Sequence, residues 1–314
     1  MGKIKKGILL IFILFLVIVG INFYHFFIMP NDYEVLHILL EDSQNKMLNT
    51  TEEKNGCIPY QILDGNLYYE EDGFYQYNYN KRKKKKLWGG EIGDFKILRG
   101  KVYYAKWNNS KSDYNVWNVE CRNLENLNKE QLIEGVSDYV FSGEFVFFSR
   151  IVGGKRYIYQ YDIKSANCNE IFSFDEFDQK REFVAGDMIL VLGNNLIFEG
   201  NGRKYITSYN INTNKWSISF NFSFQEQQLY FRILDIQAKG DFLYVQGTVC
   251  DNTKSNIAGP YVVKDAEKNG IWQVDINTGK QKHLTKTVYY GGIYILDNIL
   301  YGIDNGKYEK IGRN

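Results

Sequence analysis

The chain has 314 residues, which is enough for one large β domain or two ordinary domains. Its 38 Lys and Arg residues nearly balance its 37 Asp and Glu residues, which excludes a strong overall field directed at nucleic acid or at an acidic partner. The 25 Tyr and 21 Phe favour half-buried β-strands, and 28 Gly with only three Pro indicate many tight turns.

The first predicted element is an apolar segment near the N-terminus. Residues 7–29 contain no Asp, Glu, Lys or Arg and begin with the run GILLIFILFLVIVGI. A helix rises about 1.5 Å per residue, so this segment is long enough to cross a hydrocarbon core of about 30 Å. We therefore predict a transmembrane helix over residues 7–29.

The charges on either side of this segment predict its orientation. Residues 1–6 carry three Lys, whereas Asp32 and Glu34 follow the segment. Because the positive end of a transmembrane helix stays inside, we expect residues 1–6 to be a cytoplasmic tail and residues 31–314 to lie outside the cell membrane. A cleaved signal peptide needs small residues at its cleavage site, and only Gly20 is small, so an uncleaved single-pass signal anchor is favoured.

A polar segment over residues 30–57 follows, and we interpret it as a stalk. From residue 58 to the end at residue 314, a small turn with Gly followed by a Tyr-rich strand recurs. The instances are Leu63–Tyr69, Leu98–Tyr104, Phe141–Phe147, Val184–Leu190, Ala238–Tyr244 and Leu296–Tyr301, the last with Asn298 at the Gly position. Their spacing, between about 35 and 58 residues, brackets the length of a four-stranded propeller blade.

A second strand follows each of the first five units, with Asn or Asp between apolar residues. These positions are Asn78, Asn118, Asp162, Asn210 and Asp275. Turn chemistry such as Asn277-Thr278-Gly279 after this strand is typical of a hairpin. We predict an all-β fold, a β-propeller of six blades, with five to seven compatible with the repeat. Glu34–Leu40 or Gly56–Leu63 is expected to complete the last blade, so deletion of residues 58–63 is expected to unfold the domain.

A family resemblance rests on this repeat. The order Gly-x-apolar-Tyr-Tyr, then apolar-Asx-apolar, then Lys-x-Leu resembles bacterial extracytoplasmic β-propeller domains of unknown function, similar to the low-density-lipoprotein-receptor-like propeller. It is more loosely similar to TolB-type repeats. The likeness covers residues 58–311, but the receptor's Tyr-Trp-Thr-Asp signature is not present. The resemblance implies a six-bladed propeller with an extracytoplasmic binding or structural role.

The strongest local charge is the run Lys81–Lys86. We place it on the outer hairpin of the first unit and name Lys83, Lys84, Lys85 and Lys86 as candidate contacts for anionic headgroups or wall polymer. A solvated hairpin that blocks edge pairing is the alternative interpretation.

Trp107 is the candidate for stacking on a sugar, because it lies in a polar loop. Trp117 and Trp272 alternate with apolar neighbours and are expected in the core.

The sequence offers little for catalysis or metal binding. The three His are His25, His37 and His283, the last expected on the surface, and the four Cys are widely spaced. We therefore predict no catalytic residue, metal site or cofactor. Packed thiols are favoured over two disulfides. The carboxylates in residues 70–72 and 175–178 leave glycoside hydrolysis open.

These observations predict a membrane-anchored, non-catalytic binding or scaffolding module for an envelope glycan, peptide or protein. A polysaccharide enzyme and a sensory or assembly partner of envelope proteins remain alternatives. No nucleic-acid partner is expected.

Overall fold

A computed structural model gives the architecture of the chain. It describes residues 52–54, 60–70, 73–90, 92–108, 116–175, 185–200, 203–222, 224–226, 228–256, 259–263, 266–296, 299–304 and 307–312. Within these ranges no helix is long and apolar enough to cross a membrane. The predicted tail, the predicted transmembrane helix over residues 7–29 and most of the predicted stalk lie outside the described residues.

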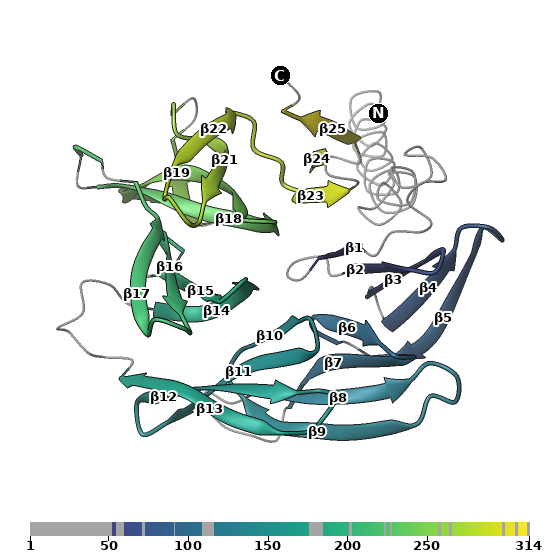
Figure 1. Cartoon of the computed structure of the whole chain (residues 1–314). Helices are drawn as coiled ribbons and strands as arrows, with labels where there is room; N and C mark the ends of the chain where they lie inside the picture. The colour runs from purple at the N-terminus through teal and green to yellow at the C-terminus, as the bar shows by residue number, and fades with distance from the viewer. Residues whose placement is uncertain are drawn as a thin grey trace, which may run out of the picture.

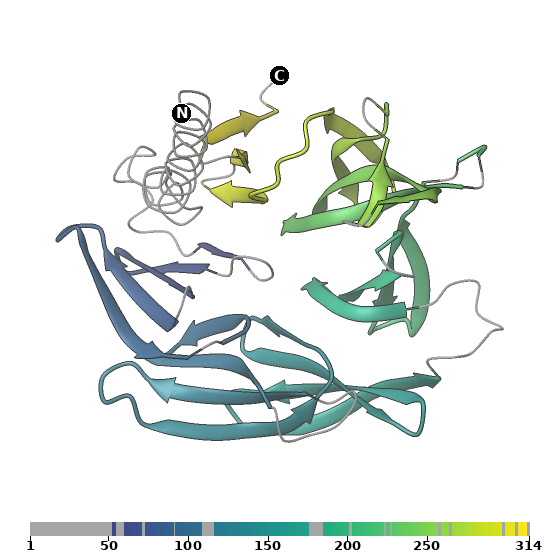
Figure 2. The ribbon, with the colours of Figure 1, turned by 180° about the vertical axis from the view of Figure 1, so that it is seen from behind.

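The described residues form six antiparallel sheets, arranged around a common axis (Figures 1 and 2). The sheets follow one another along the chain, so each is a propeller blade. Six blades and an all-β fold confirm the prediction from the repeat.

The blades are numbered in chain order. Blade 1 contains β1 (Glu52–Lys54), β2 (Tyr60–Leu63), β3 (Asn66–Glu70), β4 (Gly73–Asn78) and β5 (Lys83–Gly89). Blade 2 contains β6 (Phe95–Leu98), β7 (Lys101–Trp107), β8 (Trp117–Asn123) and β9 (Lys129–Val136). Blade 3 contains β10 (Tyr139–Ser142), β11 (Phe145–Val152), β12 (Lys155–Asp162) and β13 (Cys168–Asp175).

The second half of the ring follows the same order. Blade 4 contains β14 (Ala185–Leu192), β15 (Asn195–Gly200), β16 (Tyr205–Asn210) and β17 (Lys215–Phe220). Blade 5 contains β18 (Leu229–Lys239), β19 (Phe242–Asn256), β21 (Gly270–Asp275) and β22 (Gln281–Thr285), with β20 (Gly259–Val262) paired to β19. Blade 6 contains β23 (Ile293–Leu296), β24 (Ile299–Asp304) and β25 (Lys307–Ile311).

Antiparallel pairing divides the loops between two faces of the ring. The strands β2, β6, β10, β14, β18 and β23 run in the same sense, and the strands that follow them in each blade alternate in direction. The first and third turns after these strands therefore lie on one face, which includes Tyr79–Arg82 and Gly193; we call it the hairpin face. The other loops and the links between blades lie on the opposite face, which includes Asp94, Val152 and Arg203; we call it the connection face.

The inner hairpins depend on residues with positive φ. Asp64 and Gly65 have φ angles of 50° and 70°, the pattern of a two-residue turn matched to strand twist. In blade 4 the turn is at Gly193, with φ of 57°, and Gly186 lies inside β14. The predicted fourth turn at Gly186 was therefore wrong. The strand continues there into an apolar run whose side chains pack on both sides of the blade, Met188 and Val191 in one core cluster and Leu190 and Leu192 in the next.

The outer hairpins are closed by Asx side chains. Asp162, Asn210 and Asp275 each accept backbone N–H bonds from residues two and three positions ahead, at 2.8 to 3.2 Å. In blade 2 this role belongs to Asn123, whereas the predicted Asn118 lies earlier in β8 and bonds to Gly135. Local turn chemistry therefore explains why Asn or Asp recurs at this strand end.

Two of these caps are carboxylates whose pKa is lowered. The N–H of Lys164 lowers the pKa of Asp162, and the N–H of Thr278 lowers that of Asp275. A lowered folded-state pKa adds stability above the unfolded value of about 3.9, and this is lost as pH falls through the folded value. We expect the double variant Asp162→Asn, Asp275→Asn to be less stable than wild type near about pH 7, with a smaller deficit near about pH 3. Urea unfolding at both pH values measures this, and an equal deficit would contradict it.

Side chains also join one blade to the next. Gln61 in β2 donates to the carbonyl of Ile97 and accepts its N–H, at 3.2 and 2.7 Å. Gln246 in β19 does the same with the backbone of Tyr289, at 2.8 Å for both bonds. Gln61 bonds to the inner strand β6, and Gln246 bonds to the loop before β23, so buried hydrogen bonds link neighbouring blades.

The ring closes between blades 6 and 1 through side-chain packing. β2 pairs with β3 in blade 1, so the expectation that Gly56–Leu63 completes the last blade was wrong. Tyr60 stacks on Tyr294 of β23 with ring centroids 6.1 Å apart, within a cluster that includes Ile62 and Ile303. The other predicted segment, Glu34–Leu40, lies outside the described residues. We still expect deletion of residues 58–63 to unfold the domain, because the deletion would remove β2.

Candidate functional site

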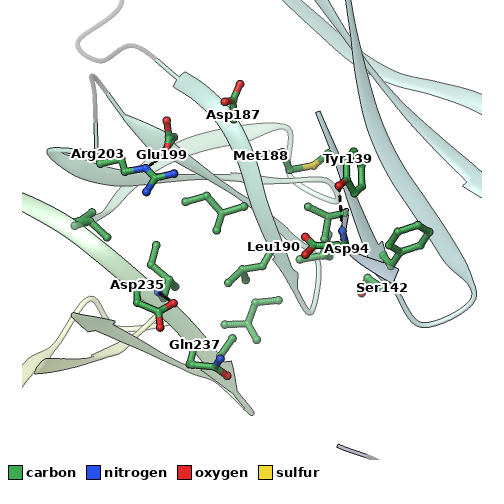
Figure 3. Close-up of a pocket in the computed structure, with 18 of the residues that line it drawn as sticks. Asp94, Tyr139, Ser142, Asp187, Met188, Leu190, Glu199, Arg203, Asp235 and Gln237 are labelled. Carbon is green, nitrogen blue, oxygen red and sulfur yellow. Dashed lines mark hydrogen bonds and ion pairs between the residues drawn. The ribbon is translucent and has the colours of Figure 1, made fainter. Parts of the chain in front are cut away.

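A pocket of about 380 Å³ lies at the centre of the ring (Figure 3). Its walls come from the inner strands of three consecutive blades, β10, β14 and β18, together with Asp94 just before β6. Arg203, in the loop between β15 and β16, also lines it. Asp94 and Arg203 lie at the connection-face end of this lining, whereas Ser142, Leu192 and Ala238 lie at the hairpin-face end of the inner strands. The pocket therefore runs along the inner strands between the two faces.

Carboxylates from three blades line the pocket. Asp94 comes from the start of blade 2, Asp187 from β14 and Asp235 from β18. The two oxygens of Asp235 accept the N–H groups of Ile236 and of Ile293 in blade 6, both at 2.8 Å. These bonds fix the position of the Asp235 carboxylate and join blade 5 to blade 6.

Close to the pocket, a buried ion pair within blade 3 also contacts blade 4. The Arg156 guanidinium lies 2.9 Å from Asp138 and 3.5 Å from Asp187. Asp138 also accepts bonds from the Ser149 hydroxyl and, at 2.5 Å, from the N–H of Met188 in β14. Two carboxylates therefore share one guanidinium, and the Asp187 side chain remains 66% exposed.

A second ion pair lies at the mouth of the pocket. Arg203 donates to Glu199 at 3.0 Å, so these two charges neutralise each other. The carbonyl of Arg203 accepts the N–H of Ile233 at 2.9 Å, which ties blade 4 to blade 5.

Tyr139 forms the wall on the side of blade 2. Its hydroxyl accepts the N–H of Asp94 at 3.2 Å, and burial raises its pKa well above the ordinary value, so it stays neutral at physiological pH. A Cβ on Gly93 would lie 2.1 Å from this hydroxyl oxygen. Gly93 is therefore required for the close approach of blades 2 and 3.

Gln237 is the buried polar side chain of the pocket. It is 7% exposed and lies two residues after Asp235, so both point to the same side of β18. Among the described residues, none forms a hydrogen bond with its amide. Ile189, Leu190 and Val191 line the pocket on β14.

The sequence analysis missed these pocket residues. A partial signal is present: Asp is followed by an apolar or aromatic residue at or near the start of three inner strands, at Asp94, Asp138 and Asp187. Asp235 lies in the second half of β18 and does not share this position.

The structure places Trp107 on the connection face. It ends β7, is 49% exposed and meets Trp117 edge to face at 5.1 Å. Val152 and Tyr290, at 61% and 74%, lie on the same face. Across the described part of the chain, these three are the most exposed large hydrophobic side chains.

The candidate lysines lie elsewhere. Lys83, Lys84, Lys85 and Lys86 are exposed and begin β5, the outermost strand of blade 1. The ammonium of Lys84 lies 4.4 Å from the centre of the Tyr75 ring, and that of Lys86 lies 5.2 Å from it. β5 starts at the hairpin face, opposite Trp107, so the structure does not bring the two predicted contacts together.

His283 is a packing residue. It stacks on Trp272 with centroids 4.3 Å apart, and its Nε2 lies 2.8 Å from the Asn269 carbonyl oxygen. The expected solvated surface role of His283 was therefore wrong. Trp117 and Trp272 pack partly buried against core clusters, as expected.

The three cysteines that the structure describes are free thiols in separate blades. Cys121 and Cys250 are buried, whereas Cys168 is exposed, so packing is correct for two of the three described cysteines. Cys57 lies outside the described residues.

The carboxylate clusters named for glycoside hydrolysis are only partly described. Glu70 and Asp175 end β3 and β13, and residues 71–72 and 176–178 lie outside the described residues. No group of three potential metal ligands occurs in the part of the chain that the structure describes.

Comparison with known proteins identifies the fold. No family model and no curated protein matches the chain. Two structures of the extracellular domain of BT4673 from Bacteroides thetaiotaomicron, described as a hybrid two-component and a one-component system, match with TM-scores of 0.50. They are 10% and 8% identical, and the matches cover 83% and 84% of this chain but 32% and 38% of those chains. The chain therefore spans about a third of their length.

A more distant match involves the nidogen/laminin complex. It has a TM-score of 0.44 and 10% identity, and covers 70% of this chain and 75% of that chain. This distance is too great to support a receptor-type function. The resemblance to the low-density-lipoprotein-receptor-like family therefore stays a prediction beyond the shared propeller fold.

Proposed function

We propose that the chain is a non-catalytic binding module outside the cytoplasm, tethered by residues 7–29 and presenting its connection face to an envelope glycan, peptide or protein. One observation carries this proposal. Trp107, Val152 and Tyr290 and the mouth of the central pocket share one face of the ring. Exposed apolar side chains around a concave site are typical of a binding surface.

The side-chain geometry supports binding over catalysis. Asp235 holds the N–H of Ile293 in the next blade, and Asp138 holds Arg156 and Met188. These carboxylates accept the hydrogen bonds that hold neighbouring blades together. A general acid or base must gain and lose a proton in each turnover, which would break these hydrogen bonds. The polysaccharide-enzyme alternative would instead need the loop carboxylates in residues 71–72 and 176–178.

The alternative role as a sensory partner of envelope proteins is supported only by similarity of fold. The BT4673 domain, with which this chain shares its propeller fold, is the extracellular part of a signalling system. A tethered propeller with a ligand-binding face is compatible with such a role for this chain.

Binding of the full-length chain to a panel of glycans and cell-wall polymers, in detergent micelles, tests the proposal. We expect binding that survives physiological salt and a Kd raised about tenfold in Trp107→Ala, because a rigid aromatic side chain contributes strongly to a contact surface. Ile218→Ala is the matched control, since Ile218 is similarly exposed but lies on the outer strand β17. Equal loss in both variants would contradict a specific connection face.

A basic contact through the lysines is tested in the same panel. If Lys83, Lys84, Lys85 and Lys86 bind an anionic polymer, replacing them with Gln is expected to abolish the part of the binding that falls as salt rises. Binding that is lost in this variant and kept in Trp107→Ala would assign the contact to blade 1 and contradict the proposed face.

A further inference from the structure

The inner strands of the blades carry backbone groups that point toward the centre of the ring. In an antiparallel pair, every second residue exchanges hydrogen bonds with its partner, and the residues between them direct their N–H and C=O away from it. A two-residue turn, as between Leu98 and Lys101 in blade 2, is closed by a hydrogen-bonded pair. The residue before that pair therefore directs its N–H and C=O toward the centre. One such residue occurs in each blade: Ile62, Ile97, Phe141, Val191, Ala238 and Ile295.

In blades 1 and 2, parts of the chain itself bind these backbone groups. β1 is an additional strand on the inner edge of β2, with Glu52 opposite Ile62. The N–H and the carbonyl of Ile97 bind the side-chain amide of Gln61, at 2.7 and 3.2 Å. A backbone strand in one blade and an amide in the next therefore indicate which chemical group fits the inner edge of a blade.

The central pocket is lined by the same position in blades 3, 4 and 5. In blade 4 this residue is Val191, on a strand that is paired on one edge only in the described sheets. The Val191 side chain packs with the core cluster of blades 3 and 4, whereas its neighbours Leu190 and Leu192 pack with that of blades 4 and 5. Because successive side chains leave to opposite sides, β14 presents its backbone edge to the pocket.

The inner edge of β18 faces the pocket in the same way. The N–H of Ile236 is bound by the Asp235 carboxylate at 2.8 Å, in agreement with the expected alternation. Ala238, two residues further, supplies the next N–H and C=O that point to the pocket. Its volume of about 380 Å³ lies within the usual range of ligand sites, about 300–1,000 Å³.

We propose that the central pocket binds an extended peptide segment through its backbone. The segment exchanges hydrogen bonds with Val191 on the inner edge of β14, as β1 does with β2, and its other edge faces Ala238 on β18. When a peptide adds a strand to a sheet edge, main-chain hydrogen bonds provide the affinity. This inference rests on the proposed binding function and specifies a polypeptide as the ligand class.

Affinity selection with the full-length chain in detergent micelles tests this. The first probe is a pool of capped heptapeptides randomised at every position. The most enriched sequence is then titrated by calorimetry, beside an analogue in which every backbone N–H is replaced by N–CH3. We expect the analogue to bind at least about tenfold more weakly, because it keeps the side chains and loses the main-chain donors. N-acetylglucosamine, which carries a single amide, is the third probe and is expected to bind at least about tenfold more weakly as well.

Two proline variants locate the contact. Val191→Pro removes an N–H that points to the pocket and takes no part in the pairing with β15. We expect it to weaken the selected peptide at least about tenfold, whereas Val191→Ala, which keeps the N–H, should bind within about twofold of wild type. Ala238→Pro is the corresponding change on β18 and is expected to weaken the peptide, with Ala238→Gly as its control. Urea unfolding establishes that each variant is folded.

The outcomes separate this inference from the proposed function. Equal affinities of the peptide and its N-methylated analogue, unchanged binding in both proline variants, or no enriched peptide would overturn the inference. Binding of N-acetylglucosamine as tight as that of the peptide would also overturn it, because a single amide would then suffice. A glycan or polymer contact that depends on Trp107 would in each case still stand. Equal loss of that contact in the Ile218→Ala control would overturn the proposed function instead.

Discussion

Asp138→Ala is expected to lower the free energy of unfolding by about 3–5 kcal/mol, because it leaves a buried charge without its nearest partner. Arg156 is almost fully buried and lies 2.9 Å from Asp138, whereas Asp187 is at 3.5 Å. The substitution also removes the acceptor of the Met188 N–H in the next blade. Urea unfolding followed by tryptophan fluorescence measures the loss.

A matched ion pair elsewhere provides the control. Arg99 of blade 2 and Glu144 of blade 3 form an ion pair in which both side chains are exposed. Glu144→Ala is expected to cost less than about 1 kcal/mol, since solvent screens exposed pairs. The double variant Asp138→Leu, Arg156→Met should be more stable than Asp138→Ala alone, because it removes both charges. Equal losses for Asp138→Ala and Glu144→Ala would contradict a buried link between the blades.

Tyr60→Ala is expected to lower the free energy of unfolding by about 3–5 kcal/mol, the range for deleting a large buried aromatic side chain. Tyr60 is buried against Tyr294, Ile62 and Ile303 at the junction of blades 6 and 1. β2 and β23 are not paired to each other in the described sheets, so packing carries much of the closure of the ring.

The control for this prediction is an exposed apolar residue. Val152→Ala is expected to change the free energy of unfolding by less than about 0.5 kcal/mol, because Val152 is mostly exposed. If Tyr60→Ala unfolds at the same urea concentration as Val152→Ala, the junction is held by other contacts and the proposed mode of closure is wrong.

The two faces of the ring change how the predicted contacts are interpreted. Trp107 and the lysines of β5 were both predicted as ligand contacts. Trp107 ends β7 at the connection face, whereas the lysines begin β5 at the hairpin face. A small ligand at the connection face therefore meets Trp107 and the central pocket without the lysines. A salt-dependent contact through the lysines would be a separate event at blade 1.

The blade repeat can be predicted from the sequence because the interactions that form its turns are local. Asp162 and Asp275 close turns with residues two and three positions ahead, and Asp64-Gly65 supplies the positive φ of an inner turn. Both partners of such an interaction lie within a few residues of each other in the sequence, so the six units can be counted from the sequence alone. The exception was blade 4, where Gly186 offered the expected pattern and Gly193 made the turn.

The contacts between blades, and with them the candidate site, could not be predicted from the sequence and become visible in the folded ring. Asp138 reaches a backbone N–H 50 residues ahead, and Asp235 reaches one 58 residues ahead. No local pattern encodes such pairs, because their geometry depends on how neighbouring sheets twist and pack. The same reason applies to the burial of Gln237 and to the separation of Trp107 from the lysines: each follows from closing six sheets into a ring.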